Sequence, residues 1–94
     1  MKKSMHDWTF ISIFVDWGGS LAILTFKNTQ SKEVELRVNG LISLYIPRKN
    51  EWGESVSVNE VIGPYKNDSK SCLEIEIQSG DKIKIEADSI NMPL

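Results

Sequence analysis

Histidine and cysteine, which build many catalytic and metal sites, are almost missing from this 94-residue sequence. It contains one of each, His6 and Cys72. A zinc site needs more ligands of this kind, and a serine or cysteine nucleophile needs a base beside it. We therefore expect no catalytic residues, no metal site, no cofactor and no enzymatic activity.

The lone cysteine also excludes an intramolecular disulfide. A chain without disulfides is typical of a reducing compartment, so we expect a cytoplasmic protein. Cys72 begins an alternating segment in which Glu74 and Glu76 share its face. Because a reactive thiolate needs a cationic setting, we expect an inert thiol.

Long apolar runs and clusters of one charge are missing too. No run approaches the roughly 20 residues of a membrane-spanning helix. The first four residues resemble the charged start of a signal peptide, but residues 6–9 are not an apolar core. The 11 Lys and Arg are scattered among 13 Asp and Glu, for a net charge of −2. We expect neither a nucleic-acid partner nor a membrane partner.

Helical periodicity is the last notable absence, and strict alternation takes its place. Residues 72–88 alternate apolar and charged side chains on both sides of Gly80. Only a β-strand places every second side chain on one face, so this stretch predicts an antiparallel hairpin. A three-residue loop over residues 79–81 keeps the apolar set on one face. It pairs Ile77 with Ile83, Ile75 with Ile85 and Leu73 with Ala87.

The first part of the chain predicts a second hairpin. Residues 8–16 form an apolar strand, and Gly18-Gly19 suits the two positive φ angles of a type I′ turn. The expected pairs are Val15 with Ala22, Ile13 with Leu24 and Ile11 with Phe26. The other face pairs Phe14 with Ile23, so it is half apolar and we expect another layer to cover part of it.

Three further strands are predicted between the hairpins, over residues 33–38, 41–46 and 55–62. Asn39-Gly40 is read as either a tight turn or a bulge. Gly63-Pro64 is expected to end its strand, with a polar loop over residues 65–71. Seven short strands imply an all-β antiparallel sandwich or an open rolled barrel, mostly a meander. We expect one domain over residues 1–94, with a disordered start at 1–5 and a tail at 89–94.

Eight residues are candidates for binding. His6 and Asp7 place an imidazole beside a carboxylate, although strand capping explains the pair equally well. Alternate polar residues after Trp52 share one strand face and form a possible polar groove. Trp17, in a hairpin turn, is the tryptophan that we expect to be most exposed. The full set is His6, Asp7, Trp17, Arg48, Trp52, Ser55, Ser57 and Asn59.

Two segments carry a resemblance to known proteins. They are His6-Asp7-Trp8-Thr9-Phe10-Ile11-Ser12-Ile13 and Ile46-Pro47-Arg48 followed by residues 52–61. Together they resemble small uncharacterised bacterial all-β proteins that open with a His-Asp strand motif. Some of these are similar to immunity proteins of toxin systems. The resemblance implies a bacterial cytosolic binding protein that uses the segment from Trp52 to Asn59.

Three functions follow as hypotheses. The first is a non-enzymatic cytoplasmic binding protein, an immunity-like inhibitor of a protein partner. The alternative is a small-molecule-binding β module with a pocket near Trp52–Asn59. A hydrolase that uses His6 and Asp7 is the third. Unless the sheet closes, its edge strands also allow a homodimer.

Overall fold

The computed structural model describes residues 5–49 and 56–93, and within them the chain forms one antiparallel sheet. The sheet has the order β1-β2-β3-β6-β5-β4, which is two three-stranded meanders joined where β3 pairs with β6. An all-β fold with a mostly meander order is therefore confirmed. The strands are β1 (Thr9–Asp16), β2 (Leu21–Lys27), β3 (Glu33–Tyr45), β4 (Val58–Asn67), β5 (Lys70–Ile77) and β6 (Lys82–Asn91).

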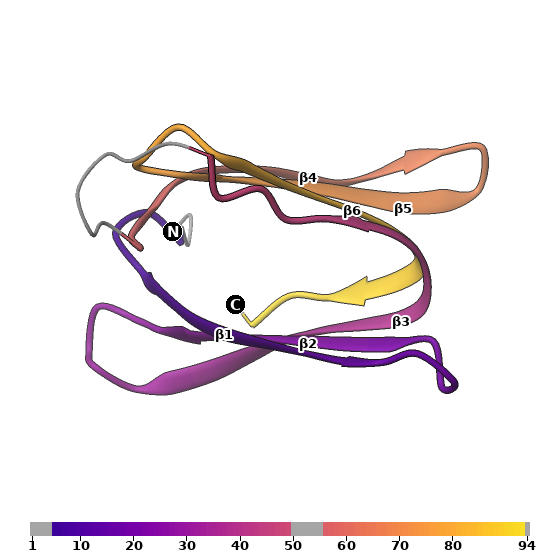
Figure 1. Ribbon diagram of the computed structural model, residues 1–94, viewed down its shortest axis with the longest axis horizontal. Coiled ribbons are helices and arrows are strands. Elements are labelled where there is room, and N and C mark those ends of the chain that lie inside the picture. Colours follow the sequence, from indigo (N-terminus) through magenta and orange to yellow (C-terminus); the bar gives the residue numbers. More distant parts are fainter. Residues whose placement is uncertain (1–4, 50–55, 94) are drawn as a thin grey trace.

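The single sheet bends over on itself, so that it has two layers (Figure 1). The first layer holds β1, β2 and the start of β3. The second layer holds β4, β5 and the end of β3, and both β3 and β6 pass from one layer to the other. The sheet stays open and is one sheet, which corrects the expected sandwich of two sheets, and it does not close into a barrel.

The described residues form six strands, and the prediction of seven was wrong because β3 is continuous. Residues 33–38 and 41–46 were expected as separate strands, but β3 runs through Gly40 from Glu33 to Tyr45. Gly40 has a φ of 65°, and a Cβ atom there would lie 2.7 Å from the Cβ of Asp88 on β6. A glycine thus lets the strand turn from one layer to the other at the point where Asp88 of β6 packs against it.

The first hairpin confirms most of its predicted register. Val15 pairs with Ala22 and Ile13 with Leu24. Phe26 faces Phe10 instead of Ile11, because the register shifts between residues 10 and 12. The positive φ in the turn falls on Ser20, at 52°, so the type I′ geometry expected of Gly18-Gly19 was wrong.

The last hairpin keeps its predicted faces but not its predicted pairs. Ile75 lies opposite Ile83 and Leu73 opposite Ile85, two residues away from the expected register. The Ile77 amide donates to the Asp81 carbonyl, which closes a three-residue loop at residues 78–80. Gly80 then takes the third loop position, with a φ of 99°. Moving the loop by one residue shifts the two strands by two residues relative to each other. Every cross-strand pair changes, but each side chain stays on the same face of the sheet, so alternation alone did not distinguish the two registers.

Two predicted breaks in the chain are strand in the structure. β4 runs through Gly63-Pro64, which was expected to end it, and the predicted loop over residues 65–71 is a two-residue turn at Asp68-Ser69. An edge strand tolerates proline because one of its sides needs no donor, and β4 lies at an edge. β6 continues to Asn91, into the stretch expected as a tail.

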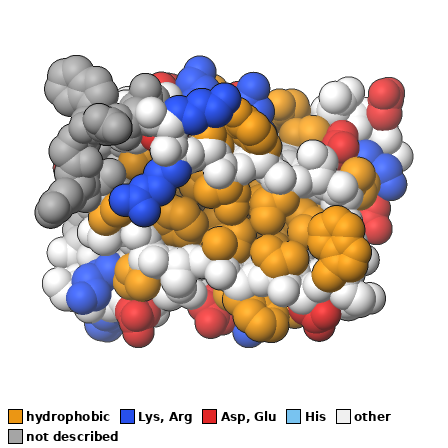
Figure 2. Space-filling view, viewed as in Figure 1, with side chains coloured by type: hydrophobic (Ala, Val, Ile, Leu, Met, Phe, Trp, Pro, Cys, Tyr) orange, Lys and Arg blue, Asp and Glu red, His pale blue; other side chains and the backbone are white. Residues whose placement is uncertain are grey.

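The hydrophobic core lies between the two layers. Met5 and Trp8, ahead of β1, are both buried, so part of the expected disordered start belongs to the core. Figure 2 shows the partly exposed apolar side chains that fill the space between the layers on one face. The buried cluster comprises Met5, Trp8, Ala22, Leu24, Phe26, Leu36, Val38, Val58, Leu73, Ile75, Ile77, Ile83, Ile85 and Ala87.

Candidate functional site

Two groups of predicted site residues meet where the open sheet nearly closes. The His6 ring nitrogen Nδ1 lies 2.7 Å from the carbonyl oxygen of Asn59, 53 residues away. Thr9 forms a bridge with Ser57, which joins the start of β1 to the segment that leads into β4. The structure therefore brings His6, Asp7, Ser57 and Asn59 into one neighbourhood.

Two residues that the sequence did not single out complete this neighbourhood. Gln78 donates from Nε2 to Asp7 Oδ1 at 2.9 Å, and its amide donates to the Ser57 carbonyl at 2.8 Å. Glu76 accepts a hydrogen bond of 2.7 Å from Asn59 Nδ2. Both belong to the last hairpin, in which they alternate with the apolar residues Ile75 and Ile77. We call His6, Asp7, Ser57, Asn59, Glu76 and Gln78 the edge junction.

The hydrogen bonds of the edge junction have a structural role. A carbonyl oxygen only accepts, so His6 Nδ1 carries the proton, while Nε2 lies 3.4 Å from Asp7 Oδ1. Backbone bonds run alongside, from the Asp7 amide to the Val58 carbonyl and from the Val58 amide to the Trp8 carbonyl. The bonds of His6 and of the backbone hold the start of β1 against β4, Asp7 binds Gln78 of the last hairpin, and Glu76 binds Asn59 across β4 and β5.

The remaining predicted residues lie elsewhere. Trp52 and Ser55 fall outside the described residues. Arg48 is exposed, and the adjacent Lys49 amide donates to Asp81 Oδ1 at 3.1 Å. Lys49 Nζ lies 5.8 Å from the centre of the Tyr45 ring, and a hydrogen bond with that side chain raises the pKa of Lys49.

Trp17 is 86% exposed, the largest value among the large apolar side chains that the structure describes, and Trp52, with which the sequence analysis compared it, lies outside these residues. Phe14, three residues earlier, is 58% exposed and pairs with Ile23 on the outer face of the hairpin. Leu21 and Ile23 are partly exposed beside it. Among the described residues no second layer covers this face, which corrects the expectation that one would. We call Phe14, Trp17, Leu21 and Ile23 the hairpin patch.

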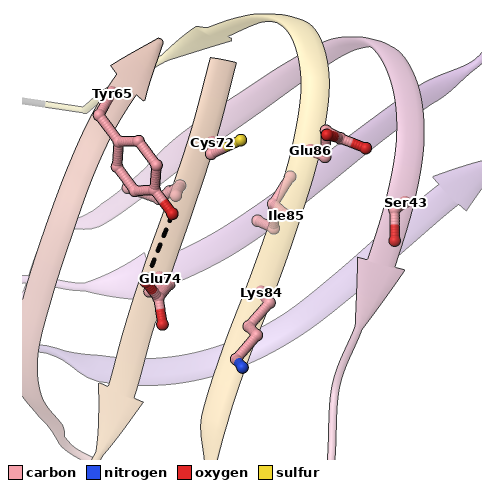
Figure 3. A pocket seen from close by; sticks show the side chains of 8 residues that line it. Ser43, Tyr65, Cys72, Glu74, Lys84, Ile85 and Glu86 are labelled. Carbon is pink, nitrogen blue, oxygen red and sulfur yellow. Dashed lines mark hydrogen bonds between the residues drawn. The ribbon is translucent and has the colours of Figure 1, made fainter. Parts of the chain in front are cut away.

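A shallow hollow lies on the outer face of the second layer (Figure 3). Its volume is about 220 Å³. The Tyr65 hydroxyl donates to Glu74 at 3.5 Å, and partial burial followed by the Glu74 charge raises the pKa of the Tyr65 phenol. Neither Ser57 nor Asn59 lines the hollow. Its lining is Ser43, Tyr65, Cys72, Leu73, Glu74, Lys84, Ile85 and Glu86.

Residues 5–49 and 56–93 offer neither a metal site nor a membrane-spanning helix. No group of three His, Cys, Asp or Glu side chains there could hold a metal ion. No helix in this part of the chain is long and apolar enough to cross a membrane.

No protein family and no curated protein matches the sequence. Among solved structures, an uncharacterized protein from Neisseria gonorrhoeae is similar over the whole length, with a TM-score of 0.65. The match covers 100% of this chain and 99% of the other, at 23% sequence identity. At this identity the likeness shows a shared fold alone.

Proposed function

We propose that this chain is a non-enzymatic protein-binding protein and that the hairpin patch is its contact surface. The observation that carries the proposal is the exposure of Trp17 at 86% and Phe14 at 58%, three residues apart in one hairpin. Tryptophan and other aromatic residues are enriched at the centres of protein interfaces, where they contribute most of the binding free energy.

The surroundings of the hairpin patch favour a particular kind of partner. Arg37, a cation on the outer face, pairs with Ile23 across the sheet and forms an ion pair with Glu35 at 3.1 Å. Asp16 lies between the two aromatic residues, and the chain carries a net charge of −2. The partner that fits is a protein with an apolar pocket for the indole ring and a basic rim.

An immunity-like role is the specific form of this proposal. A small protein that blocks a toxin needs a surface that excludes water around a few anchoring side chains, and no deep pocket. The hairpin patch is a surface of this kind. A cytoplasmic setting is supported by Cys72, which is free and buried.

The test is an affinity capture from the native host with the tagged protein, followed by calorimetry with the captured partner. Trp17→Ala should weaken binding by about tenfold or more, because a centrally buried indole is a typical anchor. Tyr65→Ala is the matched control, since Tyr65 is an exposed aromatic residue on the other layer. Equal affinity of the Trp17→Ala variant and the unmodified protein would exclude the hairpin patch.

The hollow beside Tyr65 supports a second candidate function, the binding of a small molecule. Its volume of about 220 Å³ is below the roughly 300–1,000 Å³ of usual ligand sites. A ligand there would contact the Tyr65 ring and the charged side chains of Lys84 and Glu86. Thermal-shift screening tests this candidate, and a true ligand should lose its effect in a Tyr65→Ala variant.

A further inference from the structure

Within residues 5–49 and 56–93, no strand pairs with the outer edge of β1 from Ser12 to Asp16, and this edge is largely apolar. Residues 9–15 carry no charge, and Ile11, Phe14 and Val15 are exposed. The Phe10 amide still donates to the Val56 carbonyl. Beyond it, from Ser12 to Asp16, the described part of the chain gives β1 only β2 as a neighbour. Such an uncovered apolar edge is a template for a further strand.

The direction of the free backbone groups can be inferred from the turn. The Ser20 amide donates to the Trp17 carbonyl at 3.3 Å, so Trp17 directs its backbone toward β2. Successive residues of a strand direct their backbone groups to opposite sides. Asp16, Phe14 and Ser12 therefore direct their backbone N–H and C=O groups away from β2, toward the free edge. The register shift of β1 lies between residues 10 and 12, so the strand is regular from Ser12 to Asp16.

We propose that the occupant of this edge is β1 of a second copy of the chain, paired antiparallel about a two-fold axis at Phe14. Phe14 then lies opposite Phe14 of the second copy. Ile13 lies opposite Val15, and Ser12 opposite Asp16. Every pair joins residues of one face, as an antiparallel ladder requires.

The segment from Ser12 to Asp16 is complementary to itself, which favours a second copy over an unrelated strand. The inner pairs are apolar with apolar, and each outer Ser12 hydroxyl meets a carboxylate that accepts hydrogen bonds. No like charges are opposed. A two-fold contact uses the same patch on both copies and closes without leaving an edge for further growth.

The dimer would also enlarge the proposed contact surface. Pairing about Phe14 places two hairpin patches side by side on one outer face, so that each copy contributes aromatic residues to a common surface. This consequence rests on the proposed function, whereas the dimer itself does not. Dimerisation is measured on the purified chain alone, so its failure is distinguishable from a failure to bind a partner.

The first test is the molar mass in solution, measured by light scattering over a range of concentrations. The unmodified chain should show a concentration-dependent dimer. Phe14→Lys should weaken it by about tenfold or more, because a charge at the two-fold axis opposes its own copy. Ile62→Lys, an equivalent change on the exposed face of β4, should leave the dimer intact. Circular dichroism verifies that both variants are folded.

The second test locates the axis. In a Cys72→Ala background, Phe14→Cys should form an intermolecular disulfide under mild oxidation, since paired strands hold opposite Cα atoms within disulfide range. Ile23→Cys, one strand further from the edge, should not. A chain that is monomeric at every soluble concentration overturns the proposal. A dimer that survives Phe14→Lys, or that Ile62→Lys abolishes, overturns it too.

Discussion

The two edges of this sheet, β1 and β4, are protected very differently. β4 has two register shifts, between residues 58 and 60 and between residues 62 and 65, and Pro64 lies within the second. Glu60 and Lys66 are exposed along it. β1 has one register shift, at the end where it already meets residues 56–57, and no charge or proline from Thr9 to Val15.

Bulges, proline and charged residues are the usual means by which proteins keep an edge from pairing. This chain uses all of them on β4 and almost none on β1. The contrast is the one that the proposed dimer predicts, because β4 is protected against pairing with a further strand and β1 is not. The proposed hairpin patch and the proposed dimer both depend on this unprotected, apolar character of β1.

The largest expected effect comes from removing what attaches β1 to the core. Phe26 is fully buried, and its ring lies 5.3 Å from that of Phe10 and 6.5 Å from that of Trp8, centre to centre. Phe26→Ala should lower the free energy of unfolding by about 3–5 kcal/mol, through lost burial and the cavity left behind. Urea denaturation measures the loss. Lys27→Ala, the exposed neighbour, is the control and should change little.

Hydrogen exchange in the Phe26→Ala variant sharpens the comparison of the edges. The amides of β1 should lose protection before those of β4, because the aromatic contacts of Phe26 hold the β1 side of the sheet. Equal loss along both edges would contradict a separate attachment of β1.

The next effect concerns the bend that brings the two edges toward each other. Gly40→Ala forces a side chain into a positive φ and against Asp88, which should destabilise the fold by about 1–3 kcal/mol. Gly18→Ala is a matched control, because its Cβ would meet nothing closer than 3.9 Å. Thermal unfolding compares the two variants, and equal midpoints would contradict the role of Gly40.

A smaller effect is expected at the edge junction, where the edges are fastened. Gln78→Ala removes the 2.9 Å hydrogen bond to Asp7, an exposed contact that should contribute about 0.5–1 kcal/mol. The amides of Asp7 and Val58 should exchange faster with solvent, as measured by NMR. Gln30→Ala, in the exposed turn after β2, should leave their exchange unchanged.

The smallest effect reports on the outer face beside β4. The Glu74 carboxylate contributes to the raised pKa of Tyr65, so Glu74→Gln should lower that pKa toward its usual value. Absorbance of the phenolate follows the titration in a Tyr45→Phe background, where Tyr65 is the remaining tyrosine. Glu33→Gln, on the other layer, should not shift the curve.

Local pattern and local turn chemistry account for what could be predicted. Alternation in residues 72–88 identified a hairpin and its buried face, and the spacing around Gly18-Gly19 gave the register of Val15 with Ala22. The same alternation fits two registers that differ by two residues equally well, because such a shift keeps every side chain on its face. The side-chain bond from Ser79 to Asp81, at 2.9 Å, and the positive φ of Gly80 accompany the register that forms.

The candidate sites also divide into features that the local sequence predicted and features that depend on the fold. The exposure of Trp17 followed from its place in a turn. The edge junction did not follow from the sequence, because Asp7 and Gln78 are 71 residues apart and meet only after the sheet has bent. The hairpin patch was visible as a half-apolar face, but its lack of a cover depends on where the second layer lies.

By itself, the sequence determined the all-β class, most strand positions and which side of each hairpin is buried, since a period of two has one structural solution. Only the tertiary structure decided that β3 continues through Gly40, that the sheet stays open, and that β1 and β4 are its edges. Those outcomes depend on contacts between residues far apart in the chain, such as Gly40 with Asp88 and Thr9 with Ser57. No local pattern encodes such contacts, because they form only when the whole sheet has folded over its core.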